Sequence, residues 1–392
     1  MVGPEWPKMR VLHLVKTNVG ATWAWRQIRE LVKLGLDVHV TLPAGGPMAG
    51  KYAAVGAHEH NLQTNFPVRV PWRFPSLAAE FRMLVNAVNP DIIHSHFVGT
   101  TLTMRFSLGR NHPIPRVFQV PGPLHLEHSF FRMAEIKTAG ESDSWIGSCV
   151  WTCNRYQRSG VPKDRVYLSY YGTDLNLFRK QPKGFLRSEL GLSENTRIVG
   201  MVAFMYRPKS YLGQTRGIKG HEDLIDAFAL CLQQDANMRC VFVGGAWDGA
   251  SAYEAKIKAY ARQQCGDKAV FLGNRLNVPL LYPDFDVVVH PSHSENVGGA
   301  CESLLMAIPT IASDVGGFPD LVKNGETGWL SPPRSPRQLS RAIMEALQNS
   351  KEARVRAKRG QVLARKMFDV AKTAEEVMGI YKQILSKRSS LC

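Results

Sequence analysis

Long apolar runs are missing from this chain of 392 residues. No stretch approaches the roughly 18 consecutive apolar residues of a transmembrane helix, so we expect no membrane span. The N-terminal segment also lacks the apolar region of a signal peptide. Both absences favour a cytoplasmic protein.

Paired cysteines are missing too. The seven cysteines are an odd number, lie scattered along the chain and include no CxxC pair. We therefore expect reduced, buried thiols rather than disulfides.

Acidic residues are scarce relative to basic ones. The chain has 49 Lys and Arg against 33 Asp and Glu, a net charge of +16 that is spread along its length. Such a balance suits phosphate-bearing ligands, nucleic acid or an anionic membrane surface, and an ordinary surface rich in Lys and Arg explains it equally well. The motifs below favour a phosphate-bearing small molecule, and we expect no nucleic-acid partner.

Predicted strands and helices alternate through most of the sequence. A buried strand at Arg10 to Thr17 is followed by a helix at Trp23 to Leu34 and a strand at Asp37 to Leu42. This alternation predicts an α/β fold with parallel, doubly wound sheets, and the length predicts two domains. We expect an N-terminal domain at 1–178, a linker at 179–196, a C-terminal domain at 197–370 and a C-terminal helix at 371–392.

The most informative stretch runs from His290 to Leu330. After an apolar strand comes a loop with Glu295, the pair Gly298-Gly299 and a short helix with Glu302. Glycines there expose backbone N–H groups that suit an anion, and a nearby carboxylate suits sugar hydroxyls. An ordinary βα loop with an acidic helix start is the alternative.

A basic loop follows the first strand of the C-terminal half. Arg207, Lys209, Arg216 and Lys219 lie in it, and cations at that sheet edge can bind a diphosphate through charge-assisted hydrogen bonds. A solvated loop is the alternative. The segment lacks the GxxxxGK[ST] order of a nucleoside-triphosphate loop.

Together these motifs resemble a known family. The order is a basic loop ending in KG, then FVGG, FLG, DVVVHPS, the two acids, TIAS, DVGG, PDLV and NGETGWL. It resembles the retaining glycosyltransferases of family 4, which have the GT-B fold of two Rossmann-like domains facing a central cleft. The resemblance implies transfer of a sugar from a nucleoside-diphosphate donor without a metal or other cofactor.

The resemblance also implies roles for individual residues. Lys219 matches the lysine that holds the donor diphosphate, and Glu302 matches the acid that binds the ribose. Glu295 matches the acid beside the donor sugar, although its spacing to Glu302 is one residue shorter than in the family. Phe204 occupies the slot of the partner arginine, so Arg216, or else Arg207 or Lys209, takes that part.

Further roles follow from the same resemblance. The backbone of Gly298 and Gly299 faces the sugar or phosphate, and Asn274, Arg275 and Leu276 lie where the family reads the base. In the N-terminal half, Gly20 matches the glycine loop beneath the phosphates. The slot of a family histidine that contacts the donor sugar holds Pro121, and His125 or His128 substitutes for it.

Three histidine and acid groups carry less specific signals. His94 and His96 end a strand and either touch ligand or are structural. Asp284-Phe285-Asp286 spells the metal-binding DxD of a different glycosyltransferase fold, but it precedes its strand, so we expect a structural role. His290 and His293 have no further ligands at metal spacing, and we expect no metal site.

The acceptor is the least determined part of the prediction. A saccharide or lipid-linked saccharide of cell-surface polysaccharide synthesis fits the family. The basic, Trp-bearing segment Arg69 to Phe74, with Arg82, suits peripheral contact with the anionic inner face of a membrane, or is a plain surface loop. A sugar-nucleotide epimerase of the same fold and a non-catalytic binding protein are the alternative functions.

Overall fold

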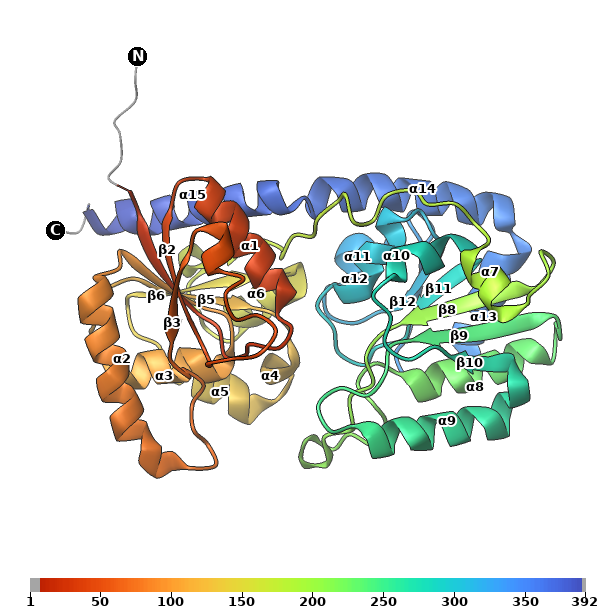
Figure 1. Cartoon of the computed structure of the whole chain (residues 1–392), viewed down its shortest axis with the longest axis horizontal. Helices are drawn as coiled ribbons and strands as arrows, with labels where there is room; N and C mark the ends of the chain where they lie inside the picture. The colour runs from red at the N-terminus through yellow and green to blue at the C-terminus, as the bar shows by residue number, and fades with distance from the viewer. Residues whose placement is uncertain (1–7, 390–392) are drawn as a thin grey trace, which may run out of the picture. The chain divides into compact units, whose positions relative to one another are not determined.

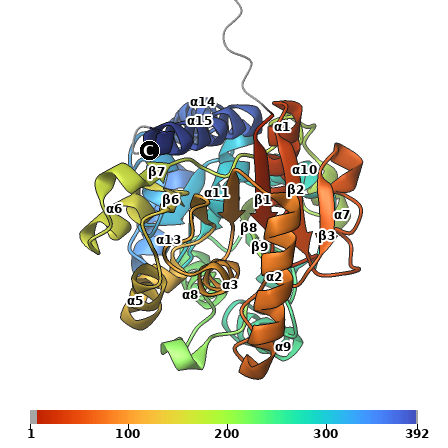
Figure 2. The ribbon, with the colours of Figure 1, turned by 90° about the vertical axis from the view of Figure 1, so that its left-hand side faces the viewer.

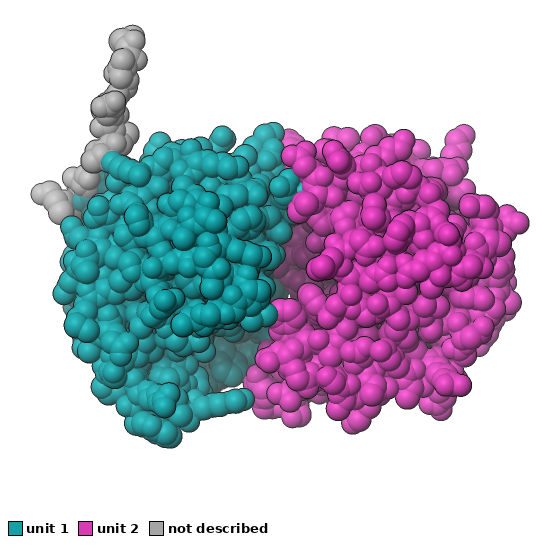
Figure 3. Space-filling view, viewed as in Figure 1, with its two compact units in different colours: residues 1–174, 367–392 teal, residues 175–366 magenta. Residues whose placement is uncertain are grey.

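The computed structural model describes residues 8–389. The chain divides into two compact units (Figure 3). The first unit contains Met1–Asp174 and Met367–Cys392, and the second contains Leu175–Lys366. The C-terminal segment therefore returns to the first unit.

The first unit is built on a seven-stranded parallel sheet with the order β3-β2-β1-β4-β5-β6-β7. Its strands are β1 (Arg10–Leu14), β2 (Asp37–Leu42), β3 (His58–Asn61), β4 (Ile92–Ser95), β5 (Arg116–Val120), β6 (Asp143–Gly147) and β7 (Val166–Leu168).

Helices cover both faces of this sheet. They are α1 (Thr22–Lys33), α2 (Phe74–Val88), α3 (Val98–Leu108), α4 (Leu124–Glu127), α5 (Ser129–Lys137), α6 (Val150–Arg158) and α15 (Val370–Ser389), and short 3-10 helices lie at Ala53–Val55, Pro71–Arg73 and Lys163–Arg165. Val11 of β1 packs with α1 and α15, whereas its neighbours Leu12 and Leu14 pack with α2 and α3. Figure 2 shows α1 and α15 on one side of the sheet and α2 and α3 on the other. The alternation in β1 is the two-residue period of a strand buried on both faces.

The second unit contains a six-stranded parallel sheet with the order β10-β9-β8-β11-β12-β13. Its strands are β8 (Arg197–Val202), β9 (Met238–Val243), β10 (Ala269–Phe271), β11 (Val287–His290), β12 (Thr310–Ser313) and β13 (Trp329–Ser331).

The helices of the second unit are α7 (Phe185–Leu190), α8 (His221–Leu232), α9 (Ser251–Cys265), α10 (Val278–Leu281), α11 (Gly298–Leu305), α12 (Phe318–Leu321), α13 (Pro336–Gln348) and α14 (Ser350–Met367), with 3-10 helices at Ser210–Leu212, Gly266–Lys268 and Tyr282–Asp284 (Figure 1). Residues of α8, α9 and α13 pack with Val199 and Met201 of β8 in one buried cluster. The chain runs from β8 outward to β9 and β10, and then returns to β11 on the other side of β8. This reversal is the switch point at which open parallel sheets bind ligands beyond the carboxyl ends of their strands.

The predicted α/β class with two parallel, Rossmann-like sheets is confirmed. The strands expected at Asp37–Leu42 and Arg116–Val120 have those bounds, but β3 was not predicted. Its sequence, His58-Glu59-His60-Asn61, is polar because the strand lies at the edge of the sheet, and it carries no apolar signal.

The segment 179–196, expected to be a linker, lies within the second unit and contains α7. Both carboxylate oxygens of Asp284 accept hydrogen bonds from backbone N–H groups at the start of α7, at 2.7 Å from Gly184 and from Leu186. Such capping fixes a short helix to the sheet, and local sequence does not reveal a partner 98 residues away.

Each of the six cysteines within residues 8–389 is buried and none forms a disulfide, and Cys392 lies outside the described residues. Across the same residues, no helix combines the length and the apolar character that crossing a bilayer requires.

Candidate functional site

A pocket of about 810 Å³ opens at the switch point of the second sheet. Val202 ends β8, Val243 ends β9 and His290 ends β11, and all three line the pocket. The carboxyl ends of neighbouring parallel strands thus form its floor. Several residues predicted from the sequence line the walls, namely Lys219, Asn274, Arg275, Leu276, Glu295, Gly299 and Glu302.

Lys219 and Glu295 meet inside this pocket. The ammonium group of Lys219 donates a hydrogen bond to a carboxylate oxygen of Glu295, and both side chains are largely buried. Burial alone lowers the pKa of Lys219, but the adjacent carboxylate outweighs that effect and leaves the pKa above its ordinary value. Lys219 is therefore charged at neutral pH.

Gly220 explains why Lys219 can occupy this position. Gly220 has φ 72°, in the left-handed region, and an ideal Cβ there would lie 2.0 Å from the carbonyl oxygen of Pro291. Only glycine allows the chain to turn into α8 so close to the loop after β11. The order Lys-Gly thus has a steric origin.

The glycine pair at the start of α11 brings that helix close to two pocket residues. An ideal Cβ on Gly298, where φ is 40°, would lie 3.1 Å from the carboxylate of Glu295. A Cβ on Gly299 would lie 3.0 Å from Cε1 of His290. Replacing either glycine by a residue with a side chain would therefore displace Glu295 or His290. Gly299 is among the lining residues, whereas Gly298 is not.

Glu302 lies one turn further along α11 and lines the same pocket. The buried hydroxyl of Tyr282 donates to its Oε2 at 3.3 Å. His290, opposite the start of α11, pairs through Nε2 with the hydroxyl of Ser303 at 3.1 Å. Burial, assisted by the charge of Lys219, lowers the pKa of His290 to about 3, so this imidazole is neutral.

The opposite wall is aromatic, which the sequence analysis missed. Phe204 and Trp247 pack with ring centroids 4.9 Å apart, and Tyr206 lies 6.1 Å from Trp247. All three line the pocket. Their positions in the chain were the signal, because Phe204 lies two residues after β8 and Trp247 four residues after β9, and the carboxyl ends of these neighbouring strands meet at this edge.

The segment expected to read a base follows β10. Asn274 accepts a hydrogen bond from the backbone N–H of Gly245 at 2.7 Å. Arg275 makes a bidentate ion pair with Glu189 of α7, at 2.7 and 2.6 Å. Leu276 is fully exposed at the pocket rim. Asn274 and Arg275 are thus fixed by protein contacts, and Leu276 offers apolar surface.

Arg216 does not line the pocket. One nitrogen of its guanidinium donates to Asp223 at 2.6 Å and to Asp226 at 2.7 Å, both on α8. Burial lowers its pKa, but the two carboxylates outweigh this and raise it above the ordinary value. Arg207 and Lys209 are also outside the pocket lining. Of the four basic residues in this loop, Lys219 is the one at the pocket.

Gly20 and His125 belong to the first unit. Gly20 has φ 73° and precedes α1. His125 lies in α4, with Nε2 3.3 Å from the Tyr156 hydroxyl, and burial lowers its pKa to about 4. His128, the alternative to His125, follows α4 directly. The roles of these residues toward a donor stay predictions.

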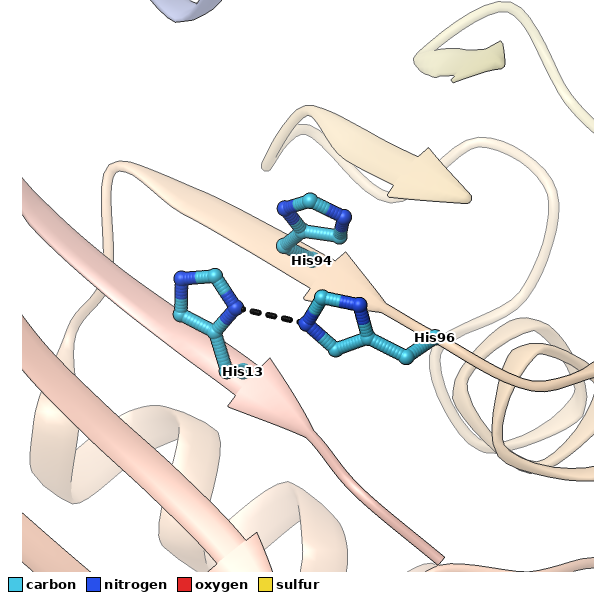
Figure 4. Close-up of side chains that lie close together, drawn as sticks. All are labelled: His13, His94 and His96. Atoms are coloured by element: carbon cyan, nitrogen blue, oxygen red, sulfur yellow. Dashed lines mark hydrogen bonds between the residues drawn. The ribbon is translucent and has the colours of Figure 1, made fainter. Parts of the chain in front are cut away.

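His94 and His96 lie with His13 in a buried cluster (Figure 4). His13 Nδ1 is 2.9 Å from His96 Nε2, and His96 Nδ1 is 2.8 Å from the Tyr171 hydroxyl. His94 Nδ1 bonds the hydroxyl of Tyr381 on α15. Burial lowers the pKa of all three rings, so they are neutral. These contacts tie β1 and β4 to α15, which fits the structural alternative.

The DxD sequence has structural contacts. Besides the capping bonds of Asp284, Oδ2 of Asp286 accepts from the backbone N–H of Ile198 at 2.8 Å. Neither aspartate is among the residues that line the pocket.

The fold and the pocket define a class of protein. Two parallel doubly wound units of this kind also occur in solved glycosyltransferase structures. Anabaena HepE, solved in complex with UDP and glucose, is 21% identical with a TM-score of 0.79, covering 95% of this chain and 99% of that one. Sucrose-phosphate synthase from Thermosynechococcus elongatus is 19% identical with a TM-score of 0.76, covering 97% and 100%. The fold is that of GT-B glycosyltransferases.

Sequence comparison identifies the family. The model for glycosyltransferase family 4 matches residues 20–177, and the model for glycosyl transferases group 1 matches residues 210–362. D-inositol 3-phosphate glycosyltransferase from Acidothermus cellulolyticus is 26% identical over 318 residues, 76% of this chain and 68% of the relative. The enzyme of that name from Thermobispora bispora is 23% identical over 76% of this chain and 71% of the relative. The chain belongs to the family 4 type of GT-B glycosyltransferases.

Proposed function

We propose that this glycosyltransferase takes its sugar from a nucleoside-diphosphate donor bound in the pocket of the second unit. The observation that carries the proposal is the convergence of Lys219, Glu295 and Glu302 on one pocket, beside the N-terminus of α11. A cation and a helix N-terminus suit a diphosphate, and carboxylates suit ribose and sugar hydroxyls. Solved HepE complexes with UDP and with UDP-glucose support this ligand class.

The three charged residues of the pocket have different roles in the proposed sugar transfer. Lys219 neutralises the charge that develops on the leaving diphosphate, in competition with its bond to Glu295. Glu302 accepts hydrogen bonds from the ribose, and Glu295 orients the donor sugar. The bond between the anomeric carbon and the diphosphate oxygen breaks, and the acceptor oxygen bonds to the same face of the sugar. Configuration is retained because the acceptor bonds to the face that the diphosphate leaves. The leaving phosphate oxygen takes the acceptor proton, and this step uses no metal or cofactor.

The aromatic wall suits the apolar faces of the donor. A base or sugar ring stacked on Trp247 or Phe204 loses water-exposed area and gains ring contacts. This wall also replaces the missing arginine with apolar surface, which leaves Lys219 as the main phosphate cation of the pocket. UDP or GDP is the expected nucleotide, and a hexose the expected sugar.

The acceptor is a hydroxyl compound. The relatives' name, D-inositol 3-phosphate glycosyltransferase, supports a polar and phosphorylated acceptor. A saccharide or lipid-linked saccharide in cell-surface polysaccharide synthesis remains our expectation for this chain.

A thermal-shift screen of UDP- and GDP-sugars tests donor binding first. We expect one nucleotide class to raise the melting temperature. Lys219→Ala and Glu302→Gln should each weaken binding about tenfold to a hundredfold, because a hydrogen bond to a charged group contributes about 1.5–3 kcal/mol. Lys351→Ala and Glu326→Gln remove the same groups from exposed positions and should leave binding unchanged. Unchanged donor binding in both pocket variants would contradict the assignment of this pocket as the donor site.

Product analysis then separates the alternatives. A transferase converts the donor only with an acceptor or water and releases the nucleoside diphosphate. An epimerase would change the donor sugar and release none, and a binding protein would turn over nothing. Carbon-bound proton NMR of the product gives the anomeric configuration, and inversion would exclude the retaining mechanism.

A surface of the first unit supports peripheral membrane contact. Val68 is 77% exposed and Trp72 is 74% exposed, and each directly precedes an exposed arginine, Arg69 and Arg73 respectively. Apolar groups beside cations suit the headgroup region of an anionic bilayer. Sedimentation with anionic vesicles tests this, with Trp72→Ala expected to weaken binding, and no binding of the parent protein at low salt would exclude it.

A further inference from the structure

A polar cluster lies at the edge of the first sheet, far along the chain from the pocket residues. Strands β2 and β3 pair in parallel with His39 opposite His58. Because side chains alternate, Asp37, His39, His58 and His60 share one face, whereas Val38 and Val40 belong to the core. Neither the reaction nor the family resemblance uses this cluster.

The ligand atoms of this cluster have metal-site spacing. Oδ1 of Asp37 lies 3.5 Å from Nε2 of His39 and 3.5 Å from Nε2 of His58. Tetrahedral Zn²⁺ with bonds of about 2.0–2.2 Å places its ligand atoms about 3.3–3.5 Å apart. One ligand atom from each residue lies within 4.8 Å of the others. The His58 side chain is 63% exposed, so its ring can rotate to close the third edge.

Neighbouring groups hold two of these ligands in the orientation that a metal needs. Nδ1 of His39 is 2.8 Å from Nε2 of His60, and the tautomer that donates there keeps the lone pair on His39 Nε2. Nε of Arg10 donates to Oδ2 of Asp37 at 2.7 Å, which leaves Oδ1 toward the histidines. Outer partners of this kind orient ligands in metal sites.

We propose that Asp37, His39 and His58 bind one Zn²⁺ ion at the edge of the first sheet, with water in the fourth position. Two imidazoles and one carboxylate suit Zn²⁺ better than Mg²⁺ or Ca²⁺, which prefer oxygen ligands. The ion would link the edge strand β3 to β2 and thereby stabilise the first unit.

The buried histidine cluster of Figure 4 is a poorer candidate. Its closest ring nitrogens, on His13 and His96, are 2.9 Å apart, which is shorter than the spacing of two zinc ligands. All three of its residues are fully buried, so an ion has no path to them from solvent. The Asp37 cluster opens to solvent through His58.

Calorimetric titration of the full-length protein with ZnCl₂ tests the proposal. The protein is purified without a histidine tag and treated with a chelator beforehand. We expect one Zn²⁺ per chain and a rise in melting temperature. His58→Ala should weaken binding more than a hundredfold, and His60→Ala about 10–100-fold, because an outer partner is lost. His112→Ala removes a histidine of the same unit outside the cluster and should change nothing.

Co²⁺ substitution gives an independent readout. A tetrahedral Co²⁺ site with nitrogen and oxygen ligands absorbs intensely in the visible range, and His58→Ala should abolish that band. Zinc binding that persists in His58→Ala and in His39→Gln would place the ion elsewhere and overturn the proposal. Millimolar affinity in the parent protein, an adventitious ion only, would overturn it equally.

Discussion

Replacing Gly220 by alanine tests whether the pocket depends on a close approach of two backbones. Gly220 has φ 72°, and its added Cβ would lie 2.0 Å from the carbonyl oxygen of Pro291. The left-handed conformation alone costs an L-residue about 1–2 kcal/mol. Overpacking against backbone adds about 1–3 kcal/mol, because a carbonyl cannot rotate away as a side chain can. We expect Gly220→Ala to destabilise the protein by about 2–5 kcal/mol.

Gly213 in the same loop provides the matched control. Its φ is 68°, and nothing lies within 4 Å of an added Cβ. Gly213→Ala should therefore cost only the conformational part, about 1–2 kcal/mol. Urea denaturation of the full-length chain, followed by circular dichroism, gives both values.

The loss of stability in Gly220→Ala should be accompanied by a loss of donor binding. Displacing Gly220 moves the adjacent Lys219, so Gly220→Ala should also weaken nucleotide-sugar binding, whereas Gly213→Ala should not. If the two variants lost the same stability and bound donor equally, the contact between Gly220 and Pro291 would not determine the pocket.

Three further predictions concern charge. Arg216→Ala should change donor affinity less than threefold whereas Lys219→Ala lowers it at least tenfold, because Asp223 and Asp226 already hold Arg216 away from the pocket; titration with the donor measures both. Asp143→Asn should destabilise the protein by about 3–5 kcal/mol in urea unfolding, because Asp143 pairs in the core with Arg105 at 2.8 Å and Arg116 at 2.6 Å, and full stability in this variant would contradict the pairing. Stability should fall as the pH falls from 7 to 5.5, because burial lowers the pKa of His13 and of His290 from 6.5 to about 3, so that over this range the unfolded chain binds protons that the folded protein does not. Each such histidine should lower the stability by about 1.3 kcal/mol between pH 7 and pH 5.5, and His290→Asn should remove the contribution of His290.

The fold was predictable from the sequence because buried parallel strands have a strong local signal. Strands such as β2 and β5 contain several Val, Leu and Phe residues within five or six positions, and the predicted bounds of both strands match the structure. The edge strand β3 lacks that signal because all four of its residues are polar. The helix α7 was hidden in a polar segment because its stabilising partner, Asp284, lies far along the chain.

The candidate site was predictable where chain neighbours determine it. Lys219 directly precedes the left-handed Gly220, Glu302 follows the pair Gly298-Gly299 within α11, and both line the pocket. The aromatic wall of Phe204 and Trp247 was missed because aromatic residues are common in cores, and only the sheet order shows that these two meet.

The basic loop shows why the rest of the site required the structure. Arg207, Lys209, Arg216 and Lys219 are equivalent as positive charges in the sequence, and each could serve a diphosphate. What distinguishes Arg216 is the acidic start of α8, where Asp223 and Asp226 share its guanidinium. Asp223 also forms a hydrogen bond with His293, which lies in the loop after β11. Arg216 therefore contacts this loop indirectly, through Asp223. Lys219, one residue before the glycine turn, instead points its charge at Glu295. A diphosphate would have to displace one carboxylate from Lys219 but two from Arg216. We therefore expect Lys219, and not Arg216, to be the cation that binds the proposed donor.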